Sequence, residues 1–171
     1  MTTIVIAGGG TGGHVFPMIA VGDAVKREEP QARVVYVGTA RGLEAKIMRE
    51  RGDELVLLDI RPLRGGGVSG FADGLLHAAL SLPRARRLAR SLGADVVLSV
   101  GGYAGGPVAL GARSLGGPAT LLEPNSVMGL SNRLLAPVSV RAYTAFPEVE
   151  RALRPSVVRR EGVPLRRAFD A

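Results

Sequence analysis

Residues 4–17 read IVIAGGGTGGHVFP, and they join a short apolar run to a glycine-rich loop. The apolar run 4–7 predicts a buried strand, and residues 17–28 predict a helix with Pro17 in its first turn, where a missing N–H group costs nothing. Glycines in such a loop let a ligand approach the main chain. Because a helix start also offers unpaired N–H groups and a partial positive charge, the loop predicts a cradle for a phosphate or diphosphate.

The alternation of strand and helix continues along the chain. Further strands are expected at residues 33–37, 55–60, 96–100, 119–122 and 138–144. Further helices are expected at residues 43–51, 71–82, 84–92, 107–114 and 130–136. This spacing predicts an α/β fold, a parallel sheet with helices on both faces. Ligands bind such sheets at the carboxyl ends of the strands, and the unusual motifs of this sequence follow strands.

The composition excludes several classes of protein. The 171 residues fit roughly one domain, and 46% hydrophobic with 22% charged residues is typical of a globular chain. No cysteine and only two histidines argue against a disulfide scaffold and against Cys-based or all-His metal sites. Residues 1–3 show no signal peptide, and no apolar stretch reaches the about 20 residues of a membrane span, so we expect a cytoplasmic protein.

The net charge of +7 is unevenly distributed. Residues 1–60 carry seven basic and eight acidic side chains, a balance of −1, whereas residues 61–171 carry fifteen and seven, a balance of +8. A basic surface predicts an anionic partner: phosphate groups, nucleic acid or an acidic membrane. The alternative is a bias of genomic composition, since 20 of the 22 basic residues are arginine.

Glycines 8, 10 and 13 also match the dinucleotide-binding fingerprint. A nicotinamide site needs an acidic residue after the second strand, and residues 37–41, VGTAR, contain none. Arg41 is suited to a 2′-phosphate, so an NADP-binding oxidoreductase stays open as an alternative.

His14 stands where the loop meets the first predicted helix. The helix dipole disfavours imidazolium and should lower the pKa of His14. A neutral imidazole beside a diphosphate cradle is suited to accept a proton from a hydroxyl nucleophile. The alternative is a structural histidine that bonds a backbone carbonyl group.

Two further strand ends carry candidate residues. Residues 101–107, GGYAGGP, form a second glycine-rich turn in which Tyr103 offers a ring and a hydroxyl group, unless the turn is merely close-packed. After the strand at 119–122, Glu123 is a second candidate base and Asn125 a candidate partner of sugar hydroxyls; the alternative is helix capping. The absence of Asp-x-Asp favours a mechanism without a metal ion. We expect no cofactor.

Residues 61–92 combine six arginines and one aspartate with many apolar residues. An apolar surface rimmed by arginine fits docking on an anionic bilayer; the alternative is that the leucines pack on the sheet and the arginines form a solvated face. With 4% aromatic residues and no recognised module, nucleic-acid binding is not expected. The candidate membrane-binding residues are Arg61, Arg64, Phe71, Leu75, Arg84 and Arg87.

Three motifs together resemble the MurG family of peptidoglycan N-acetylglucosaminyltransferases: GGTGGHVFP at 9–17, GGY with GP in 101–107, and GLSN at 129–132. The resemblance covers nearly the whole chain but only about the first half of the family's length. It implies one Rossmann-like half of a GT-B fold, in which this half binds the lipid-linked acceptor and the other holds most of the UDP-GlcNAc site. The implied reaction is inverting transfer of GlcNAc to the C4 hydroxyl of MurNAc in undecaprenyl-diphospho-MurNAc-pentapeptide. The implied place is the cytoplasmic face of the bacterial inner membrane, as a peripheral protein.

The resemblance also carries over to single residues. Thr11, Gly12 and Gly13 match the family's substrate-binding loop, and His14 matches its candidate base. Substrate-binding residues of the family are matched by Asn125 and Arg166.

The sequence departs from the family at three places. Residues 122–125 read LEPN where the family usually has HEQN, Gly105 replaces a serine, and residues 162–166, GVPLR, lack the family's asparagine.

The resemblance implies a domain at residues 1–160 and the start of an interdomain linker at 161–171. No donor-binding domain follows within these 171 residues. We therefore expect either a fragment or a chain whose donor-binding half is a separate chain; a non-catalytic truncated binding module is the alternative.

Overall fold

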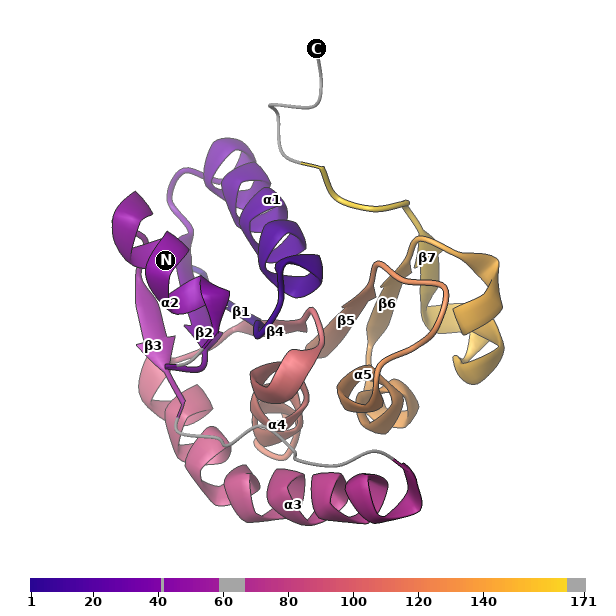
Figure 1. Cartoon of the computed structure of the whole chain (residues 1–171). Helices are drawn as coiled ribbons and strands as arrows, with labels where there is room; N and C mark the ends of the chain where they lie inside the picture. The colour runs from indigo at the N-terminus through magenta and orange to yellow at the C-terminus, as the bar shows by residue number, and fades with distance from the viewer. Residues whose placement is uncertain (41, 59–66, 166–171) are drawn as a thin grey trace.

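The computed structural model describes the backbone of residues 1–40, 42–58 and 67–165, with side chains except at 67–78 (Figure 1). The strands are β1 (Thr3–Ala7), β2 (Arg33–Gly38), β3 (Leu55–Leu57), β4 (Val96–Ser99), β5 (Ala119–Glu123), β6 (Arg141–Thr144) and β7 (Val158–Arg160). The α-helices are α1 (Gly12–Glu28), α2 (Leu43–Arg51), α3 (Gly67–Leu92), α4 (Gly102–Arg113) and α5 (Leu130–Leu135). Short 3-10 helices are η1 (Ala136–Val138), η2 (Pro147–Ala152) and η3 (Pro155–Val157).

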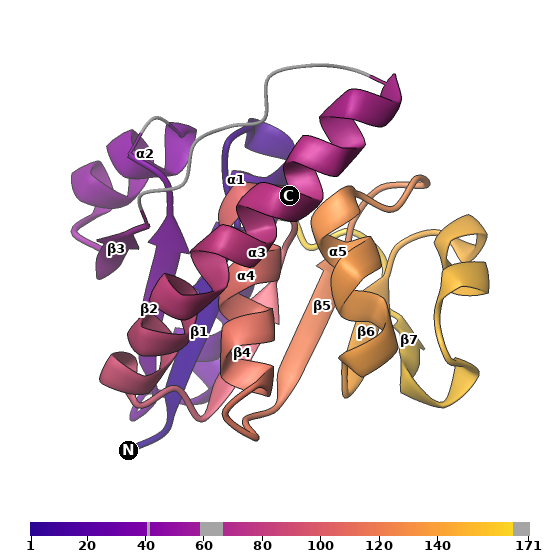
Figure 2. The same ribbon diagram turned by 90° about the horizontal axis from the view of Figure 1, so that it is seen from below.

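The described strands form one parallel sheet of the order β3-β2-β1-β4-β5-β6-β7. β1 lies at its centre, where Val5 pairs with Val35 of β2 and with Val97 of β4. Helices α1 and α2 cover one face, and α4 and α5 cover the other, with α3 packed outside α4 (Figures 1 and 2). The predicted parallel sheet with helices on both faces is therefore confirmed.

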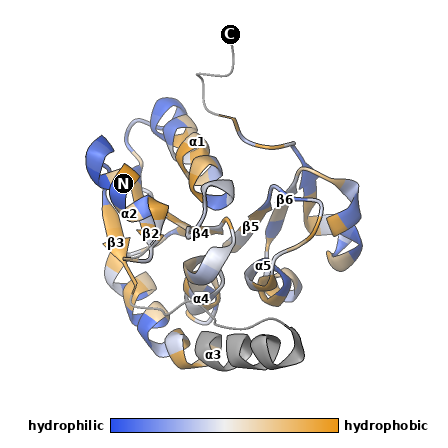
Figure 3. Ribbon diagram, in the orientation of Figure 1, coloured by the Kyte–Doolittle hydropathy of each residue, from blue (hydrophilic) through white to orange (hydrophobic). Residues whose placement is uncertain are grey.

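Alternate residues of each central strand enter two separate cores, because successive side chains of a strand point to opposite faces. Val5 and Val35 belong to the core beneath α4, whereas Ile6 and Tyr36 belong to the core beneath α1, beside Met18. Figure 3 shows the apolar residues along the strands and hydrophilic ones at the outer end of α1. The sheet is thus buried on both faces, as parallel sheets require.

The helix predictions were wrong in their bounds at three places. Helix α4, expected to begin at Pro107, begins at Gly102. Helix α1 begins at Gly12, after an extended Thr11, so Pro17 lies in the second turn of the helix and not in the first. The two helices expected on either side of Pro83 form the single helix α3. Packing explains this continuity: Ala85 is buried, and Gly111 of α4 lies so close that a side chain there would overlap the Ala85 backbone.

Strand β7 was missed by the sequence analysis. It is short and lies at the sheet edge, and two of its three residues are exposed, so it lacks the apolar pattern of the inner strands. Arg160 at its end forms a two-pronged ion pair with Glu150, at 2.8 and 2.7 Å, and the Thr144 hydroxyl donates to the same carboxylate. These bonds lower the pKa of Glu150 to about 2. Glu150 thereby ties β7 to β6.

The chain leaves β7 in a fixed direction. The N–H groups of Glu161 and Gly162 both donate to the Thr144 carbonyl oxygen, at 3.1 and 3.2 Å. Pro164 and Leu165 then lie beside α1, where they line a groove of about 520 Å³. None of the described helices is both long and apolar enough to span a bilayer.

Candidate active site

The first glycine-rich loop turns sharply between β1 and α1. Gly9 and Gly10 have φ values of +115° and +98°, in the left-handed region that favours glycine. A side chain on Gly9 would overlap the carboxylate of Glu44 from α2. The backbone conformation of the loop therefore depends on Gly9 and Gly10 and on the adjacent Glu44 carboxylate.

Glu44 is the residue of this site that the sequence analysis missed. Its side chain is fully buried, and its carboxylate accepts the N–H groups of Gly10 at 2.9 Å and Thr39 at 2.8 Å, and the Thr39 hydroxyl at 3.1 Å. From sequence, a glutamate in the first turn of a helix indicates only a favourable interaction with the helix dipole. Its contact with Gly10, 34 residues away in sequence, depends on the sheet that brings the two segments together.

Some of the amide groups left for a ligand lie in the first turn of α1. The Thr11 carbonyl oxygen accepts the N–H groups of His14 and Val15, both at 3.1 Å. The N–H groups of Gly12 and Gly13 find no acceptor among the described residues. The predicted phosphate-binding site therefore does not include every amide of the loop, since the Gly10 N–H group already donates to Glu44.

His14 lies half-buried between the two glycine-rich turns. Its Nδ1 atom is 3.3 Å from the Thr11 hydroxyl, and its Nε2 edge lies against Gly101, where an added Cβ atom would be 3.0 Å away. Burial lowers the pKa of His14, while the negative charges of Glu123 and Glu44 partly offset this effect. The expected direction of the pKa change is confirmed, but its first cause is burial and not the helix dipole.

The second glycine-rich turn contacts the first through backbone. Gly101 and Gly102 have φ values of +88° and +72°, and a side chain on Gly102 would overlap the Gly9 carbonyl oxygen. The Tyr103 ring lies beside Gly10, and the residue is 37% exposed. Tyr103 is thus placed at the rim of the first loop.

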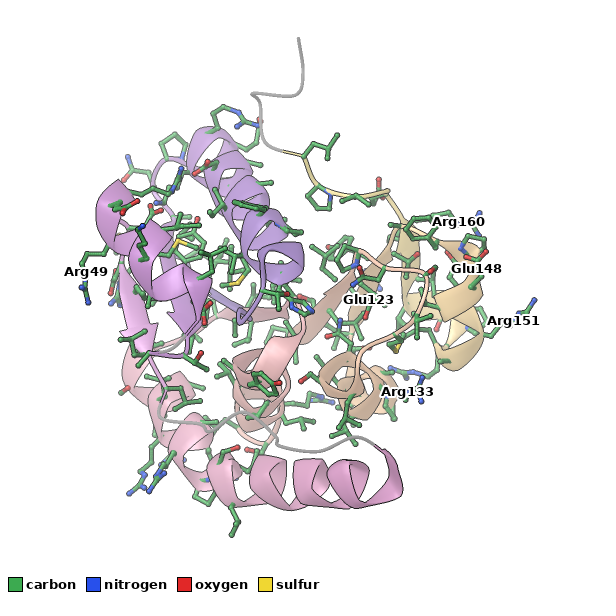
Figure 4. All side chains as sticks on the ribbon, viewed as in Figure 1. Arg49, Glu123, Arg133, Glu148, Arg151 and Arg160 are labelled. Carbon is green, nitrogen blue, oxygen red and sulfur yellow. The ribbon has the colours of Figure 1, made fainter. Side chains whose placement is uncertain are left out.

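Glu123 ends β5 and is almost fully buried (Figure 4). One carboxylate oxygen accepts the backbone and side-chain N–H groups of Asn125, at 3.2 and 3.0 Å. The other accepts Gly129 N–H and the Asn132 amide, both at 3.1 Å. The carboxylate of Glu123 therefore organises the β5–α5 loop, on which Asn125 is exposed.

A buried polar pair joins the ends of β4 and β5, and the sequence analysis quoted Asn132 only as part of a motif. Asn132 accepts the Ser99 hydroxyl at 2.9 Å and donates to the Leu122 carbonyl oxygen at 2.9 Å. Ser99 in turn accepts Gly101 N–H at 3.3 Å. Ser99 and Asn132 are 33 positions apart in the sequence, so no local pattern indicates this contact.

The structure gathers most of the expected site residues at the carboxyl ends of β1, β4 and β5. The candidates brought together there are Thr11, Gly12, Gly13, His14, Tyr103, Glu123 and Asn125. Arg41, Arg61, Arg64 and Arg166 lie outside the described residues, as do the side chains of Phe71 and Leu75.

The remaining candidates, Arg84 and Arg87, are exposed on α3. Leu80 on the same helix is 65% exposed.

Comparison with known proteins supports one of the interpretations left open above. Residues 4–144 match the model of the glycosyltransferase family 28 N-terminal domain. A curated relative from Sorangium cellulosum (strain So ce56) is 68% identical over 99% of this chain, and one from Anaeromyxobacter dehalogenans (strain 2CP-C) is 44% identical over 96%. Both are named UDP-N-acetylglucosamine--N-acetylmuramyl-(pentapeptide) pyrophosphoryl-undecaprenol N-acetylglucosamine transferase. The chain spans only 42% and 43% of their lengths.

Solved structures agree with these relatives. MurG of Acinetobacter baumannii superimposes with a TM-score of 0.74 at 30% identity, over 92% of this chain and 45% of that one. The S. aureus MnaA–UDP structure shares the fold, with a TM-score of 0.68 at 15% identity, over 92% of this chain and 44% of that one. The expected fold class, a Rossmann-like half of a GT-B fold, is confirmed. The chain therefore belongs to glycosyltransferase family 28, whose N-terminal domain it carries, and its resemblance to the amino-terminal half of the MurG family is confirmed.

Proposed function

We propose that this chain is the acceptor-binding half of a glycosyltransferase that converts a lipid-linked MurNAc-pentapeptide into its GlcNAc-bearing product. The donor is UDP-GlcNAc, and the acceptor is the C4 hydroxyl of MurNAc in undecaprenyl-diphospho-MurNAc-pentapeptide. The names of the relatives support this reaction. The observation that carries it is that the amides of Gly12 and Gly13, which have no acceptor among the described residues, adjoin the half-buried imidazole of His14.

In the proposed mechanism the acceptor diphosphate binds at the start of α1. The amides of Gly12 and Gly13 donate to its oxygens, and the exposed Thr11 hydroxyl adds a further donor. Neutral His14 accepts the proton of the C4 hydroxyl while that oxygen forms a bond to the anomeric carbon of GlcNAc. The bond from this carbon to UDP breaks, UDP leaves with the electron pair, and the configuration inverts.

Glu123 has a positioning role in this proposal. Both of its oxygens already accept hydrogen bonds, four in all, so its geometry favours holding the β5–α5 loop over accepting a substrate proton. The exposed amide of Asn125, oriented by Glu123, is available to sugar hydroxyls. Tyr103 is placed to line the same site, and the role of Arg166 in substrate binding stays a prediction.

The proposed domain comprises residues 1–160, and the proposed linker begins at 161–171. The donor-binding domain is supplied by the rest of a longer protein or by a separate chain, because the relatives are more than twice as long. The protein acts as a peripheral enzyme on the cytoplasmic face of the inner membrane. The exposed Arg84 and Arg87, near exposed Leu80, support docking on anionic lipid.

Reconstitution tests the proposed reaction. The chain is mixed with a donor-binding half taken from the matching region of a relative, and transfer of labelled GlcNAc to the lipid-linked acceptor is measured. We expect transfer from the mixture and almost none from either half alone. A mixture that binds both substrates and transfers nothing would reduce the chain to a binding module.

A further inference from the structure

We propose that Glu44 is the positioning residue of the first glycine loop: its buried carboxylate fixes the loop backbone so that the next amides remain available for the acceptor diphosphate. The inference rests on the proposed function and adds a residue that the mechanism above does not use. It places a buried negative charge directly beneath an anion-binding loop, an arrangement that electrostatics alone would disfavour.

The contacts of Glu44 join three segments. One oxygen accepts Gly10 N–H at 2.9 Å, and the other accepts the N–H and hydroxyl groups of Thr39, at 2.8 and 3.1 Å. Gly10 follows β1, Thr39 follows β2, and Glu44 itself lies in the first turn of α2. The carboxylate thus links the ends of two adjacent strands to the helix that follows them.

The Glu44 side chain fits its site because the neighbouring positions are glycines. A side chain at Gly9, Gly38 or Gly42 would overlap the Glu44 side chain. Three glycines around one carboxylate, together with full burial, indicate that this position is closely fitted to glutamate. Removing the carboxylate would leave the Gly10 and Thr39 donors unpaired, so the loop would have to move to find other acceptors.

Amide exchange in the unmodified chain is the first test. Hydrogen exchange followed by NMR should show slow exchange at Gly10 and Thr39 and fast exchange at Gly12 and Gly13, which lack acceptors among the described residues. Gly10 exchanging as fast as Gly12 would overturn the proposal. This measurement needs no variant, so it holds even if substitutions at Glu44 prevent folding.

Binding of inorganic diphosphate separates positioning from simple charge. Glu44→Gln removes a negative charge but keeps the shape, so charge alone predicts tighter binding. Positioning predicts the reverse, and we expect the dissociation constant to rise roughly ten-fold, as loss of a charge-assisted hydrogen bond implies. Unchanged or tighter binding by a folded Glu44→Gln chain would overturn the proposal. The matched control is Glu50→Gln, an exposed glutamate of the same helix, which should bind as the wild type does.

Gly42→Ala gives the complementary variant. Its φ of −82° suits alanine, but the new methyl group would overlap the carboxylate and displace it with its charge intact. Weaker diphosphate binding by Gly42→Ala supports positioning, whereas wild-type affinity with fast exchange at Gly10 would show that the Gly10 bond is dispensable and overturn it.

The His14 imidazole supplies a spectroscopic reporter. Among the described residues, Glu44 and Glu123 are the charges that raise the pKa of His14 against the effect of burial. NMR titration should therefore show a lower pKa in Glu44→Gln and no change in Glu50→Gln. If the wild-type chain binds no diphosphate, the proposed function fails, and amide exchange and this titration still decide the role of Glu44.

Discussion

His14 carries the proton in the proposed reaction, and its position is set by backbone on both sides. Replacing it with alanine in the reconstituted enzyme should lower kcat by about 10²–10⁴-fold, the usual contribution of a general base. The KM values should change little, because the diphosphate is held by main-chain amides. His77→Ala, which changes the other histidine of the sequence, is the control. A His14→Ala enzyme with wild-type kcat would remove His14 from the base role.

The pH dependence of transfer follows from the same imidazole. Burial lowers the pKa of His14 from 6.5, so the neutral form that accepts a proton persists below that pH in the folded chain. We expect the acid limb of the kcat/KM profile, which reports the ligand-free enzyme, to lie below pH 6.5. Folding stability should change in the same direction, since protonating a buried imidazole opposes the folded state: stability is full above pH 6.5 and declines below it. An acid limb at or above pH 6.5 would contradict this assignment.

At the level of single residues, the sequence predicted the site residues that lie in glycine-rich or histidine-containing motifs. It did not predict those that reach the site only through contacts formed in the folded chain. The loop 8–13 and His14 stand out locally, because so dense a run of glycines has few structural uses. Glu44 and Asn132 gain their roles from partners 34 and 33 residues away, Gly10 in the loop after β1 and Ser99 at the end of β4. No local pattern encodes such a contact, although a buried glutamate beside Gly42 is a signal once the strand order is known.

Helix α1 meets β2 through an unusually close contact between Gly22 and the Tyr36 ring. A methyl group at position 22 would overlap the Tyr36 hydroxyl, so Gly22→Ala should destabilise the chain by about 1–3 kcal/mol, although alanine favours helices over glycine by about 1 kcal/mol. Urea unfolding measures the change. Gly129→Ala, where an added Cβ atom would meet no other atom of the described residues within 4 Å, is the control and should cost little.

The Tyr36 hydroxyl itself is buried and has no hydrogen-bond partner among the described residues. Tyr36→Phe should therefore be neutral or slightly stabilising, and it should reduce the cost of Gly22→Ala when the two are combined. Equal costs of Gly22→Ala in both backgrounds would show that the clash is not with the hydroxyl group.

Element bounds were predicted well where apolar runs or a glycine cap define them. The expected helix 43–51 coincides with α2, which Gly52 ends with a φ of +70°. Prolines were the misleading signal, since Pro17, Pro83 and Pro107 all lie inside helices. In α3, buried Ala85 against α4 outweighs the local cost of Pro83.

For the molecule as a whole, the charge distribution predicts how it approaches a membrane. Replacing Arg84 and Arg87 together with alanine should lower partitioning to anionic vesicles roughly thirty-fold at low salt, since each basic side chain contributes about 1 kcal/mol, or about five-fold. The control is Arg141→Ala with Arg159→Ala, which changes the charge equally at the other edge of the sheet. Equal losses in both double variants, or equal binding of the wild type to neutral lipid, would show that α3 is not the docking face.

The overall architecture was predictable because repeated βαβ units constrain it strongly. Parallel pairing and two helical layers follow from the alternation of apolar runs with amphipathic stretches. β7 did not follow, because Val158 alone of its three residues packs on the core, and no sequence pattern indicates the Glu150–Arg160 pair that ties it to β6. The proposed dependence on a second domain came from the resemblance to the MurG family, and the hydrophobic periodicity of the sequence does not predict it.

The contact between Gly102 and the Gly9 carbonyl has a mechanical consequence. Two turns that meet through bare main chain leave no side chain to absorb a displacement, so neither can shift without carrying the other. A sugar that binds beside Tyr103, in the second turn, would thereby restrict the motion of the first turn, where the diphosphate is proposed to bind. Binding of the sugar and binding of the diphosphate should therefore be cooperative, coupled through the backbone contact between the two turns.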